Sequence, residues 1–167
     1  GRIPIVVDTT SCTHTLLCET GGDILTPENR EKYKQLKIMD ITQWLKEVVL
    51  PRIKVIRPKN RILLHPTCSC QIMGLTPVLL DIARKCAREV ILPDNWGCCG
   101  ASGDRGFIFP ELSDSATRDE RDEIGHESFD GCYSLARTCE IAMQDHIEQP
   151  YESIVYLVDE TIQDQGT

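Results

Sequence analysis

Short apolar runs alternate with longer amphipathic stretches along this chain. Four runs bounded by turn formers or polar residues predict strands, at residues 3–7, 61–65, 89–92 and 131–134. Helical spacing or capping residues predict six helices between and after them, at residues 27–35, 41–49, 74–88, 116–124, 137–147 and 153–162. The run at residues 3–7 reads as a buried strand. The alternation predicts an α/β fold with an open, mainly parallel sheet of about four strands flanked by helices.

Composition narrows the functional classes. The chain has 167 residues, of which 41% are hydrophobic, and this is enough to form the core of one domain. Its formal charge is -8 and it has no long basic run, which argues against nucleic acid or an anionic membrane surface as a partner. No apolar stretch approaches the 18 residues that a transmembrane helix needs. The sequence also begins at Gly1 with an apolar run, which suggests a fragment of a longer protein.

Nine cysteines are the unusual feature of the composition. An odd number cannot pair completely within the chain, and without a secretory signal most are expected to be thiols. Six of them follow predicted strands: Cys12, Cys68, Cys70, Cys98, Cys99 and Cys139. Because the carboxyl ends of parallel strands share one edge of the sheet, several thiolates should meet there. Such clusters suit an iron-sulfur centre or zinc.

The remaining candidates are assigned weaker roles. Cys18, Cys86 and Cys132 lie in or beside apolar segments and are interpreted as packing residues, whereas Cys70 is a substitute ligand at most. His65, at a strand end, is interpreted as a residue that supports the ligands or the structure. Asp104 and Arg105 lie in a glycine-rich loop, where they would orient a cluster or tune its potential, or form an exposed ion pair. The acidic run at residues 119–123, which includes an arginine, reads as a solvated helix face.

Four segments carry a resemblance to a known family. They are His-Pro-Thr-Cys at 65–68, Cys-Cys-Gly-Ala-Ser-Gly-Asp-Arg-Gly at 98–106, Pro-Glu-Leu at 110–112 and Arg-Thr-Cys-Glu at 137–140. Together they resemble the cysteine-rich CCG domain that occurs in heterodisulfide reductase, in the iron-sulfur subunit of glycolate oxidase and, with the closest similarity, at the C terminus of FAD-linked D-lactate dehydrogenases.

The family pattern closes with Cys-x-x-Cys, and here Ala136 stands at the first position of that pair. The resemblance therefore does not imply the five-thiolate double cluster of heterodisulfide reductase. It implies four ligands, Cys68, Cys98, Cys99 and Cys139, for one 4Fe-4S cluster or a tetrahedral zinc. Cys12 matches the closing cysteine of a preceding half-unit, and it is a less certain fifth neighbour.

The resemblance also implies how the chain is organised and what its parent does. Residues 1–20 would end a truncated first half-unit and residues 61–167 would form a complete second one. The parent would be a cytoplasmic oxidoreductase, peripheral to the inner face of the membrane, that oxidises D-lactate or a similar 2-hydroxy acid. FAD and ferredoxin-like domains would precede this fragment, which would hold no catalytic residue and would pass electrons from reduced flavin to a quinone or cytochrome-type acceptor.

Two other functions stay open at this point. Four thiolates could close a structural zinc site in a domain that only docks subunits. Alternatively, Cys98 or Cys99 could be a nucleophile for thiol-disulfide chemistry, activated by the positive charge of Arg105.

Overall fold

The structure is a computed structural model that describes residues 2–19 and 24–162. Residues 1, 20–23 and 163–167, where the predicted half-units begin or end, lie outside the described residues.

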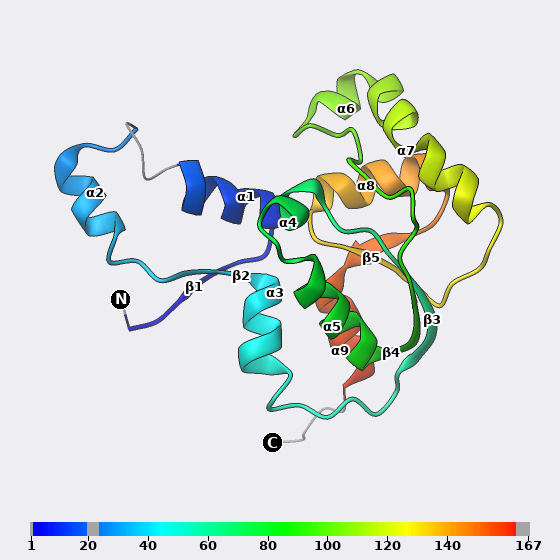
Figure 1. Cartoon of the computed structure of the whole chain (residues 1–167), viewed down its shortest axis with the longest axis horizontal. Coiled ribbons are helices and arrows are strands. Elements are labelled where there is room, and N and C mark those ends of the chain that lie inside the picture. The colour runs from blue at the N-terminus through cyan, green and yellow to red at the C-terminus, as the bar shows by residue number, and fades with distance from the viewer. Residues whose placement is uncertain (1, 20–23, 163–167) are drawn as a thin grey trace.

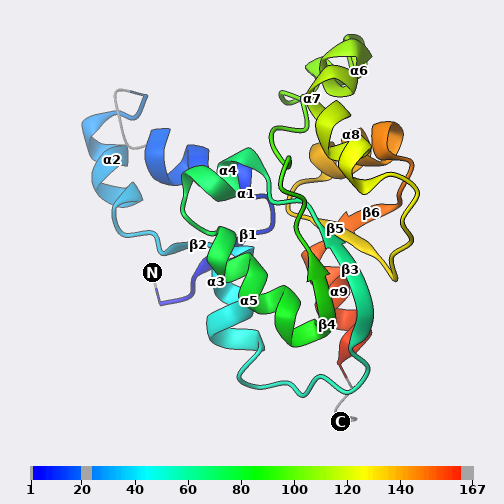
Figure 2. The same ribbon diagram turned by 45° about the vertical axis from the view of Figure 1, so that its right-hand side comes forward.

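The main sheet has four parallel strands in the order β4-β3-β5-β6 (Figures 1 and 2). The strands are β3 (Lys59–Leu64), β4 (Ala87–Ile91), β5 (Cys132–Ser134) and β6 (Tyr151–Ser153). Ile62 lies opposite Val90, and Leu63 lies opposite Cys132. The predicted α/β class with an open, parallel four-stranded sheet is therefore confirmed.

One strand of the expected set lies elsewhere. β1 (Ile5–Val7) pairs with β2 (Ile38–Asp40) in a separate parallel two-stranded sheet, and β6 completes the main sheet instead. The expectation of a buried strand is wrong here, because Ile5 and Val6 are exposed. Three residues paired with one short neighbour among the described strands leave too little structure to cover both faces of the run.

Most of the predicted helices are present. The α-helices are α1 (Thr10–His14), α2 (Pro27–Tyr33), α3 (Ile41–Trp44), α4 (Cys68–Ile72), α5 (Thr76–Cys86), α6 (Arg105–Ile108), α7 (Pro110–Ile124), α8 (Arg137–Ile147) and α9 (Ile154–Thr161). The π-helical segments η1 (Thr15–Glu19) and η2 (Leu45–Val49) continue α1 and α3. The sequence did not predict α1, α4 and α6, and α7 begins six residues earlier than residue 116.

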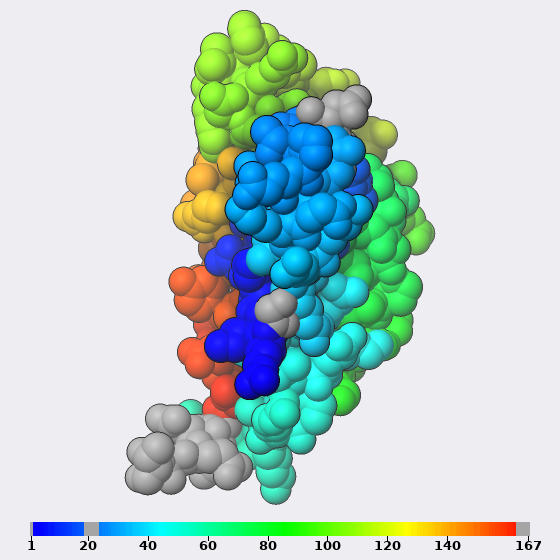
Figure 3. Space-filling model, turned by 90° about the vertical axis from the view of Figure 1, so that its left-hand side faces the viewer, coloured from blue at the N-terminus to red at the C-terminus, as the bar shows by residue number. Residues whose placement is uncertain are grey.

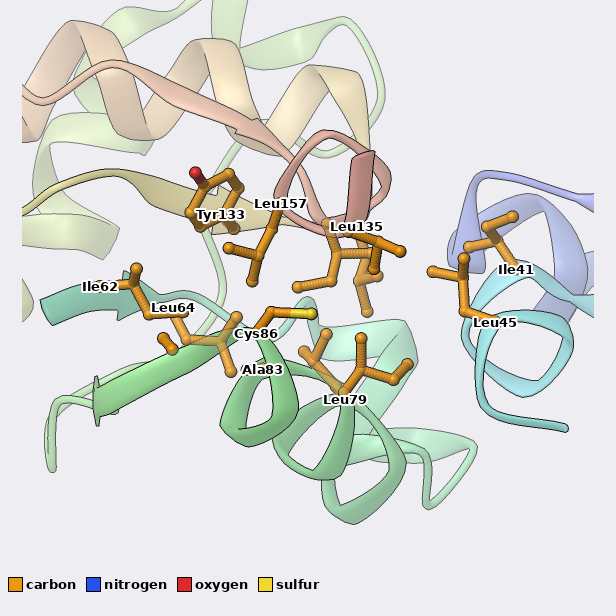
Figure 4. Close-up of a cluster of buried hydrophobic side chains, with 14 of the residues drawn as sticks. Ile41, Leu45, Ile62, Leu64, Leu79, Ala83, Cys86, Tyr133, Leu135 and Leu157 are labelled. Carbon is orange, nitrogen blue, oxygen red and sulfur yellow. The ribbon is translucent and has the colours of Figure 1, made fainter. Parts of the chain in front are cut away.

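Alternating residues of β3 belong to two hydrophobic cores on opposite faces of the main sheet. Ile62 and Leu64 belong to the first core together with apolar residues of α5 and α9, as Figure 4 shows around Cys86 and Leu157, and α3 joins the far side of this core. Leu63 faces the other core, which α7 and α8 cover and which contains Cys99 and Cys139. The period of two along the strand thus places two of the cysteines in the second core.

A structural repeat relates the two sheets. β1, α1, β2 and α3 occur in the same order as β5, α8, β6 and α9, with a parallel strand pair in each set, although η1 and α2 lie between α1 and β2. Cys12 and Cys139 each come five residues after the first strand of their set, after Val7 and Ser134. In each set the second strand ends in a helix-capping residue: Asp40 accepts a hydrogen bond from the Thr42 amide, and Ser153 from the Val155 amide.

The β1–β2 unit stands apart from the main sheet in the ribbon view, and in the space-filling view α2 and β1 lie toward the viewer (Figures 1 and 3). Among the described residues, no helix is both long and apolar enough to cross a membrane.

Candidate thiolate centre

Four of the predicted ligands line one pocket of about 290 Å³: Cys68, Cys98, Cys99 and Cys139. They follow the carboxyl ends of β3, β4 and β5, the three neighbouring strands at one side of the main sheet. The parallel direction of these strands brings together cysteines that are up to 71 residues apart in the sequence (139 − 68). The pocket is therefore a product of the sheet topology.

Cys68 and Cys139, the first and the last of these four cysteines in the sequence, each lie in the first turn of a helix. Cys68 is the first residue of α4, and the side chain of Thr67 caps that helix by accepting a hydrogen bond from the Cys70 amide at 3.2 Å. Cys139 lies in the first turn of α8, after Ala136. Both ligand positions thus sit at the start of a helix that follows directly from a strand of the sheet.

The adjacent pair Cys98 and Cys99 needs a tight turn, which Gly100 provides with φ +73°. The Gly100 amide donates a hydrogen bond to the sulfur of Cys98 at 3.4 Å. The Ala101 amide hydrogen-bonds to Cys99 and favours its thiolate form. Sequence reasoning did not identify these two amides, although hydrogen bonds to ligand sulfurs are one way in which a protein sets the potential of an iron-sulfur cluster.

The four thiols interact in a row. The neighbouring Cys99 thiol is the main reason that the pKa of Cys98 is raised, and burial adds to it. Cys139 in turn raises the pKa of Cys99 to about 12. Burial and, next, the charge of Cys98 raise the pKa of Cys68. At neutral pH Cys68, Cys98 and Cys99 are therefore protonated in the metal-free protein, because burial and neighbouring thiols disfavour their charged forms.

The pocket is deep on one side and open on the other. Cys99 and Cys139 are 4% and 8% exposed, whereas Cys68 and Cys98 are exposed. A group held by all four sulfurs would be enclosed by the protein beside Cys99 and Cys139. It would be close to solvent and to a partner molecule beside Cys68 and Cys98.

The donor set of the pocket consists of four soft thiols. In the ranges 2–19 and 24–162, no three His, Cys, Asp or Glu side chains already surround a point at which a single metal ion could bind. The four sulfurs line a pocket of about 290 Å³, in which Cys99 interacts with Cys98 and with Cys139. Four soft thiolates suit both an iron-sulfur core and zinc.

The other cysteines lie outside this pocket. Cys12 is exposed and lines a neighbouring pocket, and Ser11 is common to both. Cys70 is buried beside Thr76, with Sγ 3.9 Å from Oγ1, and burial raises its pKa to about 12. Cys86 and Cys132 are buried in the two hydrophobic cores, as expected for packing residues. Cys18 was expected to pack as well, but it is exposed because its side of η1 faces away from both cores.

Neither charged residue of the glycine-rich loop lines the thiol pocket. Asp104 and Arg105 are exposed at the start of α6. The wall of the pocket nearest to them is formed instead by Ser102 and Gly103.

His65 is buried, and its partner is a residue that the sequence suggested would be solvated. The Nδ1 atom of His65 lies 2.9 Å from one carboxylate oxygen of Glu120 on α7 and 3.1 Å from the other. His65 is 1% exposed and Glu120 2% exposed. The acidic run at residues 119–123 is therefore not wholly a solvated face. In the structure the buried positions on α7, Ser113, Thr117, Glu120 and Ile124, recur every three or four residues, but most of them are polar and do not stand out in the sequence.

Comparison with models of known protein families gave no match, and a search of curated proteins gave none either.

Proposed function

We propose that this chain binds one 4Fe-4S cluster through Cys68, Cys98, Cys99 and Cys139 and relays electrons through it. The observation that carries the proposal is the meeting of four thiols from three strand ends in one pocket. When bound, such a cluster accepts and donates single electrons at irons held by cysteine sulfur. The wider proposal is that the chain is part of an FAD-dependent D-lactate or 2-hydroxy acid dehydrogenase and passes electrons from reduced flavin to a quinone or cytochrome-type acceptor.

The chain's own groups support this role in three ways. The four cysteines supply the sulfur ligands and would release their protons when metal binds. The amides of Gly100 and Ala101 hydrogen-bond to the sulfurs of Cys98 and Cys99, which stabilises their negative charge. The exposed Cys68 and Cys98 leave one side of the site accessible to an electron donor or acceptor.

A structural zinc site is the second candidate, because four thiolates also suit that metal. Thiol-disulfide chemistry is less well supported. A nucleophilic cysteine needs a lowered pKa, whereas the pKa values of Cys98 and Cys99 are both raised by neighbouring thiols. Arg105, the charge expected to activate them, does not line the pocket.

Elemental analysis of the chain purified without oxygen separates the first two candidates. We expect iron and acid-labile sulfide near four atoms each per chain. One zinc per chain without sulfide would replace the relay by a structural role. If the chain bound neither metal after anaerobic reconstitution, the ligand assignment would be wrong.

Two cysteine variants test the ligand set itself. Cys99→Ser should abolish the brown absorbance of the reconstituted protein, since it removes one of the four sulfurs. Cys86→Ser is the matched control, because Cys86 is also buried but lies in the other core. An unchanged spectrum for Cys99→Ser would contradict the assignment.

A further inference from the structure

The segment that carries Cys98 and Cys99 is attached to α7 at both of its ends. Before the cysteines, the amides of Asp94 and Asn95 donate to the carboxylate of Glu123 at 2.7 and 2.8 Å. After them, Gly100 packs so closely on α7 that an added Cβ atom would lie 2.6 Å from the Leu112 carbonyl oxygen. The position of this cysteine pair therefore depends on the position of α7.

Cys68 is positioned from a different element. It lies three residues beyond His65, which the main sheet holds through its backbone. The His65 amide donates to the Tyr133 carbonyl at 2.9 Å, and the His65 carbonyl accepts from the Ser134 hydroxyl at 2.9 Å. The position of Cys68 thus depends on the position of the main sheet.

The buried pair of His65 and Glu120 connects these two elements. One member extends from the end of β3 and the other from α7, and both carboxylate oxygens lie within hydrogen-bond distance of Nδ1. Such a contact between buried groups is costly to break, because either partner alone would lose its hydrogen bond away from water. Figure 2 shows α6 and α7 projecting beyond the main sheet, where a fixed link to the sheet restricts their movement.

We propose that His65 and Glu120 are positioning residues that hold the Cys98–Cys99 pair at ligand distance from Cys68. The inference rests on the proposed function, because it assigns the pair a role in assembling that same four-sulfur site. The role is mechanical: the hydrogen bond from the ring N–H of His65 to Glu120 sets the distance, and neither side chain binds the metal.

Two substitutions that replace Glu120 by side chains of similar length test its hydrogen bond to His65. Glu120→Gln keeps an oxygen that accepts from His65, whereas Glu120→Met keeps a similar length without an acceptor. Asp122→Asn, on the exposed face of the same helix, is the matched control. Co²⁺ is the probe, since its absorption when bound to thiolates grows with the number of sulfur ligands. We expect four thiolates in the wild-type, Gln and Asn proteins, and a loss of one or two in the Met protein.

A second measurement needs no metal. Metal-free protein is treated with diamide, a mild oxidant that takes two electrons and two protons from a pair of thiols as they form a disulfide. Peptide mapping then gives the yield of the Cys68–Cys98 disulfide. We expect a yield at least fivefold lower for Glu120→Met than for Glu120→Gln. His65→Phe, which keeps a ring but has no N–H to donate to Glu120, should also lower it and replaces the Met variant if that protein does not fold.

The outcomes separate this inference from the function on which it rests. A wild-type chain that binds Co²⁺ without four thiolates contradicts the proposed ligand set. A wild-type chain with four thiolates and a folded Met variant that equals it in both measurements contradicts the positioning role alone. Failure of Glu120→Gln to restore wild-type behaviour would also overturn that role, because it would show that the hydrogen bond is not what matters.

Discussion

Cys98 and Cys99 hold their protons more tightly because other thiols lie beside them. The pKa of Cys99 rises to about 12 mainly through Cys139, and that of Cys98 rises mainly through Cys99. Buried thiols without such neighbours, such as Cys132, reach a similar value through burial alone. In the metal-free protein Cys98 and Cys99 are thus neutral at physiological pH, and metal binding must displace their protons.

Metal affinity should therefore increase with pH. Cys68, Cys98 and Cys99 have raised pKa values, so each is protonated below pH 9 and loses its proton when it becomes a ligand. Release of three protons would raise the apparent Zn²⁺ affinity up to about 1,000-fold per pH unit, and acid would lower it in the same proportion. Competition with a chelator between pH 6.5 and 8 measures the slope. Cys99→Ser should reduce the slope by about one proton, and a pH-independent affinity would contradict the assignment.

The sequence indicates these cysteines well and Glu120 poorly, for a physical reason. Strand ends can be recognised from short apolar runs, and parallel topology then requires their cysteines to share an edge. The buried stripe of α7 consists instead of Ser113, Thr117, Glu120 and Ile124, so hydrophobicity does not mark most of it. The Glu120 carboxylate lies in this buried stripe because it hydrogen-bonds to His65, which is 55 residues earlier in the sequence. Tertiary pairing of this kind has no local pattern.

At the level of elements, the turn that follows Cys98 and Cys99 packs closely on α7 at Gly100. Gly100 has φ +73°, and an added Cβ atom would contact the Leu112 carbonyl oxygen, the Ser113 Cα atom and the Ala116 side chain within 3 Å. Gly103 has a similar φ of +75° but open space around it. The two glycines thus differ in packing on α7 and hardly in backbone conformation.

Alanine at each glycine should separate these two effects. Gly103→Ala should cost about 1 kcal/mol of unfolding free energy, which is the penalty for a side chain at positive φ. Gly100→Ala should cost a further 1–3 kcal/mol or so from overpacking against α7, and it should weaken metal binding by displacing Cys98 and Cys99. Urea unfolding of the metal-free proteins gives the comparison. Equal losses for the two variants would show that the loop is not seated on α7 as described.

The elements that the sequence did not predict are all short. β2 and β6 have three residues each, which is too few for an alternating pattern to stand out from a loop. β6 also runs directly into α9, so that its residues merge with the apolar pattern of the helix. α5 and α8, with 11 residues each, match their predicted ranges to within two residues. Length alone does not separate the successes from the misses, because β1 and β5 also have three residues each and lie within predicted strands.

For the molecule as a whole, stability should reside in the four-stranded sheet and its helices. Both hydrophobic cores form around that sheet, and α3 and η2 reach the first of them through Ile41 and Leu45. β1 and β2 contribute no residue to the buried members of either core. The repeat therefore has two unequal copies, of which only the second is enclosed by packed helices on both faces.

Matched isoleucines in parallel strands test this difference. Ile62 in β3 is 0% exposed, whereas Ile5 in β1 is 45% exposed. Ile62→Ala leaves a cavity in the first core and should lower the unfolding free energy by about 2–5 kcal/mol. Ile5→Ala removes side-chain atoms that already contact water, so its loss should stay below about 1 kcal/mol.

Urea unfolding measures both losses, and hydrogen exchange locates them. Amides of β3 and β5 should exchange only through global unfolding, while those of β1 and β2 exchange through local opening at lower free energy. Ile62→Ala should then speed exchange throughout the main sheet, and Ile5→Ala should speed it in β1 and β2 alone. Equal losses for the two variants, or equal protection of the two sheets, would mean that the β1–β2 unit unfolds together with the main sheet.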